Sequence, residues 1–306
     1  MSDTEKQNQT YVTEFILLGF GDLPELQVPL FLLFLVIYMV TMIGNILVLV
    51  LVVANQHLHT AMYFFLSNLS CLEMCYSSTI LPKLLASSLT GDRGISYSSC
   101  MTQFFIFAFL VGVECFLLAV MSYDRYLAVC KPLHYVTLMN RKLCITLATG
   151  AWVSGFIISF VITMWMSQMV YCNRNEIDHF FCDFTPVIKC SCSDTFLIEA
   201  VTSLMSATCT MLPFLFTVAS YILIIINILR IPSVTGRKKT FSTCYSHLFV
   251  VTIFYTTLIL VYTLPKTYNL TAVNKLFSVL YTVVTPTVNP VIYALRNKEV
   301  RKALRK

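Results

Sequence analysis

The chain has 306 residues, of which 57% are hydrophobic and only 12% are charged, whereas about 25% of residues are charged in ordinary soluble domains. A water-soluble fold cannot bury that much apolar surface, so the composition indicates a membrane protein. The net charge of +6 is spread along the chain without a long basic run. This distribution favours charges placed beside a membrane and excludes a nucleic-acid partner.

Residues 1–10 are polar and contain no apolar segment ahead of a small-residue cleavage site, so we expect no removable signal peptide. The first membrane span then has to act as the insertion signal. Asn8 is followed by Gln9 and Thr10 and forms a glycosylation sequon. The sequon is usable only if this end of the chain faces the lumen.

Seven stretches are long and apolar enough to predict membrane-spanning helices, which need about twenty residues each. The sixth and seventh are the least apolar, as expected for helices surrounded by their neighbours. The prediction is an all-α membrane protein, a seven-transmembrane helix bundle (26–293) between an outer N-terminal segment (1–25) and a cytoplasmic tail (294–306). The predicted spans are 26–53, 61–85, 101–129, 144–166, 196–228, 241–262 and 276–293.

The charges predict the orientation of this bundle. With the N-terminus outside, 11 of the 15 acidic residues fall on the outer side and 14 of the 21 Lys and Arg residues fall on the cytoplasmic side. This agrees with the positive-inside rule. The cytoplasmic cations are Arg125, Lys131, Arg141, Lys142, Arg230, Arg237, Lys238, Lys239, Arg296, Lys298, Arg301, Lys302, Arg305 and Lys306.

Two other classes of protein fit the sequence less well. A transporter or channel usually has internal repeats or an even number of helices, and no repeat is evident. An ion-coupled transporter or channel stays open as a remote alternative because acidic residues lie inside predicted spans. An enzyme is not expected, because the five histidines form no His-Glu-x-x-His pair and the chain has no Gly-x-Ser-x-Gly motif and no phosphate-binding loop.

The third predicted span ends in a charged sequence. Asp124 and Arg125 lie side by side where the apolar run stops, and an arginine there can exchange one partner for another, as a switch does. A solvated ion pair at a helix end is the simpler interpretation. The surrounding residues, Met121 to Tyr135, favour the switch, because they resemble the third-helix signature of olfactory receptors within the rhodopsin-like G-protein-coupled receptors.

Other segments resemble the same family, in the same order along the chain. One departure is Ala61, where the family usually has proline. The resemblance covers essentially the whole chain. It is carried by residues 12–20, Gly44 and Asn45, residues 58–70, Trp152, Pro213, Ser220 and Tyr221, residues 239–248 and residues 286–297.

The resemblance implies two disulfides on the outer side, where such bonds persist. In the family, the middle cysteine of the second outer loop pairs with the third helix, and the two flanking cysteines pair with each other. By this pattern Cys100 pairs with Cys182, Cys172 pairs with Cys192, and Cys190 stays free.

Two acidic residues, Glu73 and Glu114, lie within predicted spans. A carboxylate there is costly unless it is paired, hydrated or protonated, which makes each a candidate functional residue. The resemblance implies that they surround a sodium ion together with Asn45 and Asn289, although the family more usually has aspartate where Glu73 stands. A protonated acid that hydrogen-bonds a neighbour is the alternative.

The resemblance also implies a ligand pocket between the outer halves of the third, fifth, sixth and seventh helices. Phe107 stands where amine-binding receptors have aspartate, so a charged amine is expected to find no counter-ion. A mainly apolar pocket suits a small volatile odorant; the alternatives are a non-odorant metabolite as ligand and, for single residues, a role in helix packing. The expected lining residues are Phe107, Ala108, Val111, Gly112, Met205, Ser206, Cys209, Tyr255, Leu258, Ile259, Tyr262, Val279 and Thr282.

A stimulatory G protein that raises cyclic AMP is the partner implied by the family, with Tyr255 relaying ligand binding to the sixth helix. Helical geometry places Phe107, Glu114 and Arg125 on one face of the third helix, with about 16 Å between the last two. Residues 297–306 predict a short amphipathic helix against membrane lipid, and the family implies the plasma membrane of olfactory cilia. The expected switch and coupling residues are Asp124, Arg125, Tyr126, Tyr221, Arg237, Lys238, Lys239, Asn289, Pro290 and Tyr293.

Overall fold

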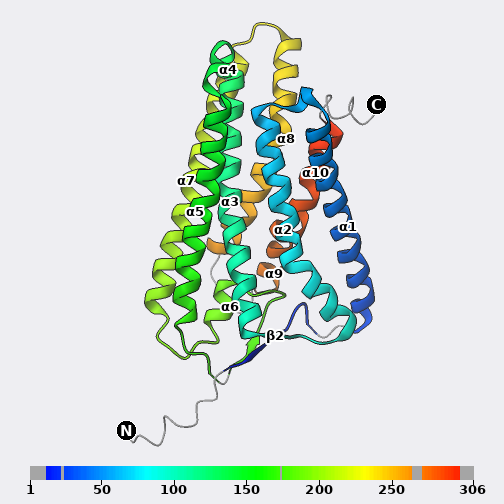
Figure 1. Ribbon diagram of the computed structural model, residues 1–306, viewed down its shortest axis with the longest axis vertical. Helices are drawn as coiled ribbons and strands as arrows, with labels where there is room; N and C mark the ends of the chain where they lie inside the picture. The colour runs from blue at the N-terminus through cyan, green and yellow to red at the C-terminus, as the bar shows by residue number, and fades with distance from the viewer. Residues whose placement is uncertain (1–11, 22–23, 173, 264–270, 297–306) are drawn as a thin grey trace, which may run out of the picture.

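Seven long helical segments run side by side in the computed structural model, which describes residues 12–21, 24–172, 174–263 and 271–296 (Figure 1). This confirms the predicted helical bundle. The segments are α1 (Pro24–Ala54), α2 (Ala61–Thr90), α3 (Tyr97–Cys130), α5 (Arg141–Ser167), α7 (Phe196–Leu229), α8 (Val234–Thr263) and a seventh that joins α9 (Thr271–Val279), the π-helical turn η5 (Leu280–Val284) and α10 (Thr285–Arg296).

Each predicted span lies within one of these segments, and the helices continue beyond it. Among the described helices, α1, α3, α5 and α7 are each long and apolar enough to cross a membrane. The largest extension is at the start of α8, which begins at Val234 rather than at residue 241. Arg237 and Lys238 therefore belong to a helix that projects past the apolar run.

Short polar sequences set several helix ends. Ser96 caps α3 by accepting a hydrogen bond from the Ser99 backbone nitrogen at 3.2 Å. Asn140 caps α5 by accepting one from the Leu143 nitrogen at 2.9 Å. Gly91 ends α2 with φ of 74°, a left-handed conformation that glycine adopts without steric cost.

Helix α3 is the centre of the bundle and contacts α2, α5, α7 and α8. Its closest neighbour is α5, and two glycines make that approach possible. A Cβ atom on Gly155 would lie 2.7 Å from the Val113 side chain and 2.9 Å from the Phe109 carbonyl oxygen. A Cβ on Gly112 would lie 3.2 Å from the Gly155 Cα. Any larger residue at position 155 would force the two helices apart.

A small sheet covers one end of the bundle, which we call the sheet end. Strand β1 (Glu14–Leu17) pairs antiparallel with β2 (Gly94–Ser96) and parallel with β3 (Glu176–Ile177). The N-terminal segment is thereby joined to two loops that connect long helices. The opposite end, which we call the α4 end, carries α4 (Tyr135–Leu138) and the turns η2 (Gln56–Leu58) and η3 (Pro132–His134).

Disulfides fix the long loop between α5 and α7 at the sheet end. Cys100 on α3 is bonded to Cys182, and Cys172 is bonded to Cys192, the same pairs that the family resemblance implied. Cys190 is free and buried, and this burial raises the pKa of its thiol. The first bond holds the middle of the loop directly over α3.

Some predictions fall outside the described residues. They are the glycosylation site at Asn8, the amphipathic helix at 297–306 and the side chains of Lys239, Tyr262 and Tyr293.

Candidate functional site

A cavity of about 180 Å³ lies near the sheet end, between α3, α5, α7, α8 and the short helix α6 (Phe184–Ile188). Apolar side chains form most of its wall, as in sites for small uncharged molecules. It brings together eight of the residues expected to bind ligand: Phe107, Ala108, Val111, Gly112, Ser206, Cys209, Leu258 and Ile259.

Four other expected pocket residues do not line this cavity. Tyr255 is fully buried behind its wall and donates its hydroxyl to the Cys115 carbonyl over 2.8 Å. The Thr282 hydroxyl is used within its own helix, where it donates to the Ser278 carbonyl over 2.6 Å. The remaining two, Met205 and Val279, pack against neighbouring parts of the core.

A cluster of aromatic rings explains why the seventh segment is absent from the cavity wall. The ring of Phe107 lies 5.5 Å from that of Tyr76 on α2, 6.2 Å from that of Tyr281 on η5 and 4.7 Å from that of Phe181 in the loop, measured between centroids. These rings fill the space between α3 and the seventh segment. The cavity is consequently displaced toward α5 and α7.

Two parts of the wall were not predicted. One is a face of α5, and the other is the loop that follows Cys182. The disulfide to α3 was a usable signal for the loop, because it fixes the residues after Cys182 above the third helix. The unpredicted lining residues are Phe104, Cys115, Ile158, Ser159, Ile162, Asp183, Phe184, Thr185, Thr202, Ser203, Ala207, Thr210 and Met211.

Asp183 corrects the expectation of a pocket without an acidic side chain, which was based on Phe107 alone. Its side chain is 5% exposed and lines the cavity. One carboxylate oxygen accepts a hydrogen bond from the Phe184 backbone nitrogen over 2.8 Å and so caps α6. The acid comes from the loop rather than from a helix, which is why helix positions did not reveal it.

The α7 side of the cavity is both polar and open. Thr202 is buried, and its hydroxyl oxygen has no hydrogen-bond partner among the residues that the structure describes. Ser203, Ala207 and Met211 line the cavity and are also exposed on the outside of the bundle. The cavity is therefore open along this face of α7, close to the unpaired Thr202 hydroxyl.

A layer of buried polar residues lies deeper in the bundle. Glu73 accepts a hydrogen bond from the side-chain nitrogen of Asn289. The side-chain nitrogen of Asn45 donates to the carbonyl oxygens of Thr41 and Pro286, at 3.0 and 3.3 Å. Glu114 is 1% exposed. Helices α1, α2, α3 and α10 each contribute one side chain to this layer. Its hydrogen bonds join α10 to α1 and to α2.

Four side-chain oxygen atoms of this layer have no hydrogen-bond partner within the described ranges. They are Asn45 Oδ1, Glu73 Oε2, Glu114 Oε1 and Asn289 Oδ1. Hard cations take oxygen ligands of this kind, so the donor set fits a sodium ion, and it equally fits protonated carboxyl groups. Across residues 12–21, 24–172, 174–263 and 271–296, no three His, Cys, Asp or Glu side chains are placed to hold a metal. Any ion here would depend on amide oxygens.

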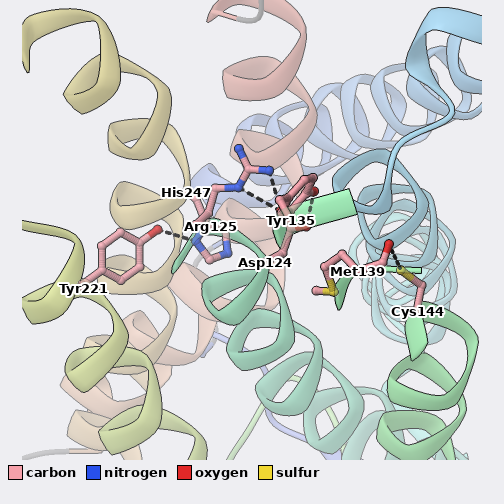
Figure 2. A network of polar contacts seen from close by, with 7 residues as sticks. All are labelled: Asp124, Arg125, Tyr135, Met139, Cys144, Tyr221 and His247. Carbon is pink, nitrogen blue, oxygen red and sulfur yellow. Dashed lines mark hydrogen bonds and ion pairs between the residues drawn. The ribbon is translucent and has the colours of Figure 1, made fainter. Parts of the chain in front are cut away.

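The α4 end carries the charged pair of α3 (Figure 2). Arg125 forms an ion pair with Asp124 at 2.5 Å, and its Nε donates to the same oxygen at 3.0 Å. Tyr135 on α4 donates its hydroxyl to the other Asp124 oxygen over 2.7 Å. Burial, followed by the charge of Asp124, raises the pKa of Tyr135. Asp124 is 0% exposed, so this pair is a buried lock rather than a solvated helix end.

A second contact joins α7 to α8 beside this lock. The Tyr221 hydroxyl lies 2.5 Å from the Nδ1 atom of His247, and both side chains are buried. Tyr126 packs against the small hydrophobic cluster that includes Tyr221 and Cys244. His247 was not predicted as a switch residue, although it lies in the 239–248 segment that resembles the family.

The other expected coupling residues lie around these contacts. Arg237 donates to the Ile231 carbonyl over 3.2 Å, and Lys238 is exposed. The ring of Pro290 faces α1 so closely that a Cβ on Gly44 would lie 3.1 Å from it. The structure thus places contacts of the α4 end on three long helices, α3, α7 and α8, that also line the cavity.

The sequence is similar to that of a large family of receptors. A profile described as olfactory receptor matches residues 34–306. The chain is 48% identical to olfactory receptor 11L1 of Homo sapiens, over 99% of this chain and 94% of that protein. It is 47% identical to olfactory receptor 10A7 of Homo sapiens, over 98% and 95%, and 47% identical to olfactory receptor 1f45 of Rattus norvegicus, over 98% and 96%. The chain therefore belongs to the olfactory receptor family of G-protein-coupled receptors and is not an enzyme.

Proposed function

We propose that this receptor binds a small, mostly apolar volatile odorant in the cavity and activates a stimulatory, olfactory-type heterotrimeric G protein that raises cyclic AMP. The observation that carries the proposal is the course of α3. This helix lines the cavity with Phe107 and Cys115 and ends at the buried lock of Asp124 and Arg125. Cys115 and Arg125 are ten residues apart, or about 15 Å along the helix.

The cavity volume sets the size of the ligand. A cavity of 150 Å³ in another protein holds benzene, so the cavity of about 180 Å³ here suits a molecule of roughly seven to ten non-hydrogen atoms. The Thr202 hydroxyl favours a ligand with one hydroxyl, carbonyl or ester group, and most of the remaining wall is apolar. This matches a small alcohol, aldehyde or ester better than a large or multiply charged metabolite.

The orientation follows from the charges of the sequence. The sheet end faces the outside and the α4 end faces the cytoplasm, in the plasma membrane and, by family, in olfactory cilia. Ligand binding is then relayed by Tyr255, which bonds the back of the cavity wall, to an outward movement of α8. Release of Arg125 from Asp124 and of Tyr221 from His247 opens a groove for a helix of the G protein.

The polar layer between cavity and lock is proposed as an allosteric site for sodium. Glu73, Glu114, Asn45 and Asn289 supply the oxygen atoms. Sodium would lower agonist potency in the parent receptor and have no effect in a Glu114→Gln variant. If agonist potency did not depend on sodium in either protein, the result would instead favour the interpretation that Glu73 and Glu114 are protonated.

An odorant panel tests the proposed function. The receptor is expressed with a stimulatory G protein and a cyclic AMP reporter, and alcohols, aldehydes and esters are compared with amines. We expect responses to the neutral compounds and loss of all responses in Arg125→Ala, with surface expression retained. Responses confined to amines would contradict the ligand class, and a ligand-evoked ionic current without cyclic AMP would favour the channel alternative.

A further inference from the structure

A second concave site lies at the α4 end, on the side of the bundle. It is a groove of about 500 Å³ between the end of α1, the turn η2 and the first turns of α2 and α5. Its mouth carries His59, Thr60 and Arg141, all of them exposed. We propose that this groove binds an anionic glycerophospholipid of the cytoplasmic leaflet, with the phosphate at Arg141 and an acyl chain along the apolar wall.

The apolar wall shows where the chain of such a lipid would lie. Phe64 and Ile145 line the groove at 36% and 46% exposure. They follow the first residues of α2 and α5 by three and four positions, which is about one helical turn. Leu58 and Met139 close the back of the groove and are buried. Polar side chains thus lie at the helix ends, and apolar side chains lie one helical turn further along α2 and α5. A lipid with a polar head group and an acyl chain fits this arrangement.

The charge of the mouth selects an anionic head group. The Arg141 side chain makes no hydrogen bond or ion pair with any residue in the described part of the chain, so its guanidinium is available for a phosphate, which it can bind through two parallel hydrogen bonds. Among the residues that the structure describes, none of those lining the groove is acidic. Asp124, the nearest acid in the sequence on this side, is buried and paired with Arg125.

His59 shapes the mouth instead of supplying charge. Its Nε2 atom lies 3.0 Å from the Val52 carbonyl oxygen. A carbonyl can only accept, so Nε2 carries a proton and the ring is fixed against the end of α1. The mouth is therefore a formed site with one free cation at its rim. The inference rests on the proposed orientation, because the cytoplasmic leaflet is the one that carries anionic lipids.

Native mass spectrometry of the purified full chain tests this directly, without odorant or G protein. The probes are dioctanoyl phosphatidylserine and dioctanoyl phosphatidylcholine. We expect the serine lipid to be retained at least severalfold more than the choline lipid. Each cation near an anionic lipid surface is worth about 1 kcal/mol, which converts to about fivefold in binding. Arg141→Gln should therefore weaken binding of the serine lipid about fivefold.

Lys142→Gln is the matched control, because Lys142 is an exposed neighbouring cation that does not line the groove. It should change binding less than twofold. Equal losses in the two variants would overturn the proposal in favour of diffuse surface charge. Equal retention of both lipids by the parent receptor would overturn it as well.

A third arm separates a lipid from a free phosphate compound. Glycerophosphoserine carries the same head group without acyl chains and should not compete with the lipid. Ile145→Trp should block the apolar wall and reduce lipid binding while surface expression and the odorant response are retained. Competition by glycerophosphoserine, or full binding in Ile145→Trp, would show that the groove takes a soluble anion. Because binding is measured without signalling, a failed odorant response would leave the result intact.

Discussion

Tyr255 on α8 donates its hydroxyl to the backbone carbonyl of Cys115 on α3 over 2.8 Å, and Cys115 lines the cavity near the sheet end. In the proposed mechanism this hydrogen bond joins α3, which would contact the ligand, to α8, which would move outward. It links the two at a buried site, where a hydrogen bond is worth about 0.5–1.5 kcal/mol net.

Tyr255→Phe is expected to raise ligand-independent signalling about two- to tenfold, because removal of the hydroxyl lowers the free-energy cost of separating α8 from α3 by that amount. Basal cyclic AMP, normalised to surface expression, is the measurement. Tyr245→Phe is the control, since Tyr245 is 38% exposed on the same helix. Unchanged or lower basal activity in Tyr255→Phe would show that this contact does not hold the resting state.

Thr202→Val should reduce potency about two- to tenfold for an alcohol ligand and leave the potency of its methyl-substituted hydrocarbon analogue unchanged. The reason is loss of the one buried hydroxyl in the cavity that has no partner among the described residues. Dose–response curves for the matched ligand pair give the comparison. Thr208→Val on the exposed face of α7, where the hydroxyl bonds the Leu204 carbonyl, should behave as the parent receptor. Equal losses for both ligands would assign Thr202 to packing.

Gly155→Ala is expected to destabilise the receptor by about 1–3 kcal/mol, because the added Cβ overlaps backbone atoms of α3. The expected result is a lower thermal midpoint and lower surface expression. Gly150→Ala on the same helix is the matched control, since a Cβ there meets nothing within 4 Å and alanine favours the helix. If the thermal midpoint and surface expression fell equally in both variants, the close approach of α3 and α5 would not be the cause of the destabilisation.

The loop that carries β3 and His179, which we call the cap, should open more readily in mild acid. Burial, assisted by the charge of Lys275, lowers the pKa of His179 to about 3, against about 6.5 when the loop is open. The open loop therefore binds more protons between these values, so cap stability is complete above pH 6.5 and falls as the pH drops toward 3. The loss is about 1.6 kcal/mol between pH 6.5 and pH 5.

Hydrogen exchange at the β1–β3 ladder checks this expectation. The amide of Leu18, bonded to the Ile177 carbonyl at 2.9 Å, should lose about sixteenfold in protection between pH 6.5 and 5 after correction for intrinsic exchange. His179→Phe removes the titrating ring and keeps an aromatic group beside Phe180 and Phe181. Its protection should be nearly independent of pH over the same range, and a parallel fall in both proteins would rule out His179.

The helices and the two disulfides could be predicted from the sequence more completely than the residues that line the cavity. Apolar runs of helical length mark all seven segments, and the resemblance implied both disulfides. The sheet at one end of the bundle was not predicted, because its strands have two to four residues and so short a stretch shows no alternating pattern.

The cavity wall depends on tertiary contacts that no local pattern records. Glycines at positions 112 and 155 bring α5 against α3, and the Cys182 bond brings Asp183 over it. The aromatic rings around Phe107 then fill the space beside the seventh segment, which is why Val279 and Thr282 do not reach the cavity. Helix positions alone cannot show how large side chains divide the interior.

The cavity is open beside Ser203, Ala207 and Met211. This opening means that the odorant concentration in the bilayer, rather than in water, would govern the receptor's response. In the proposed orientation this opening would face acyl chains, whereas the sheet and the ion pair of Lys275 with Asp178 cover the end that would face water. An odorant that dissolves in the bilayer is already at the entrance. Its apparent potency should therefore track its oil–water partition coefficient, and two compounds with equal intrinsic affinity would differ in threshold by the ratio of those coefficients.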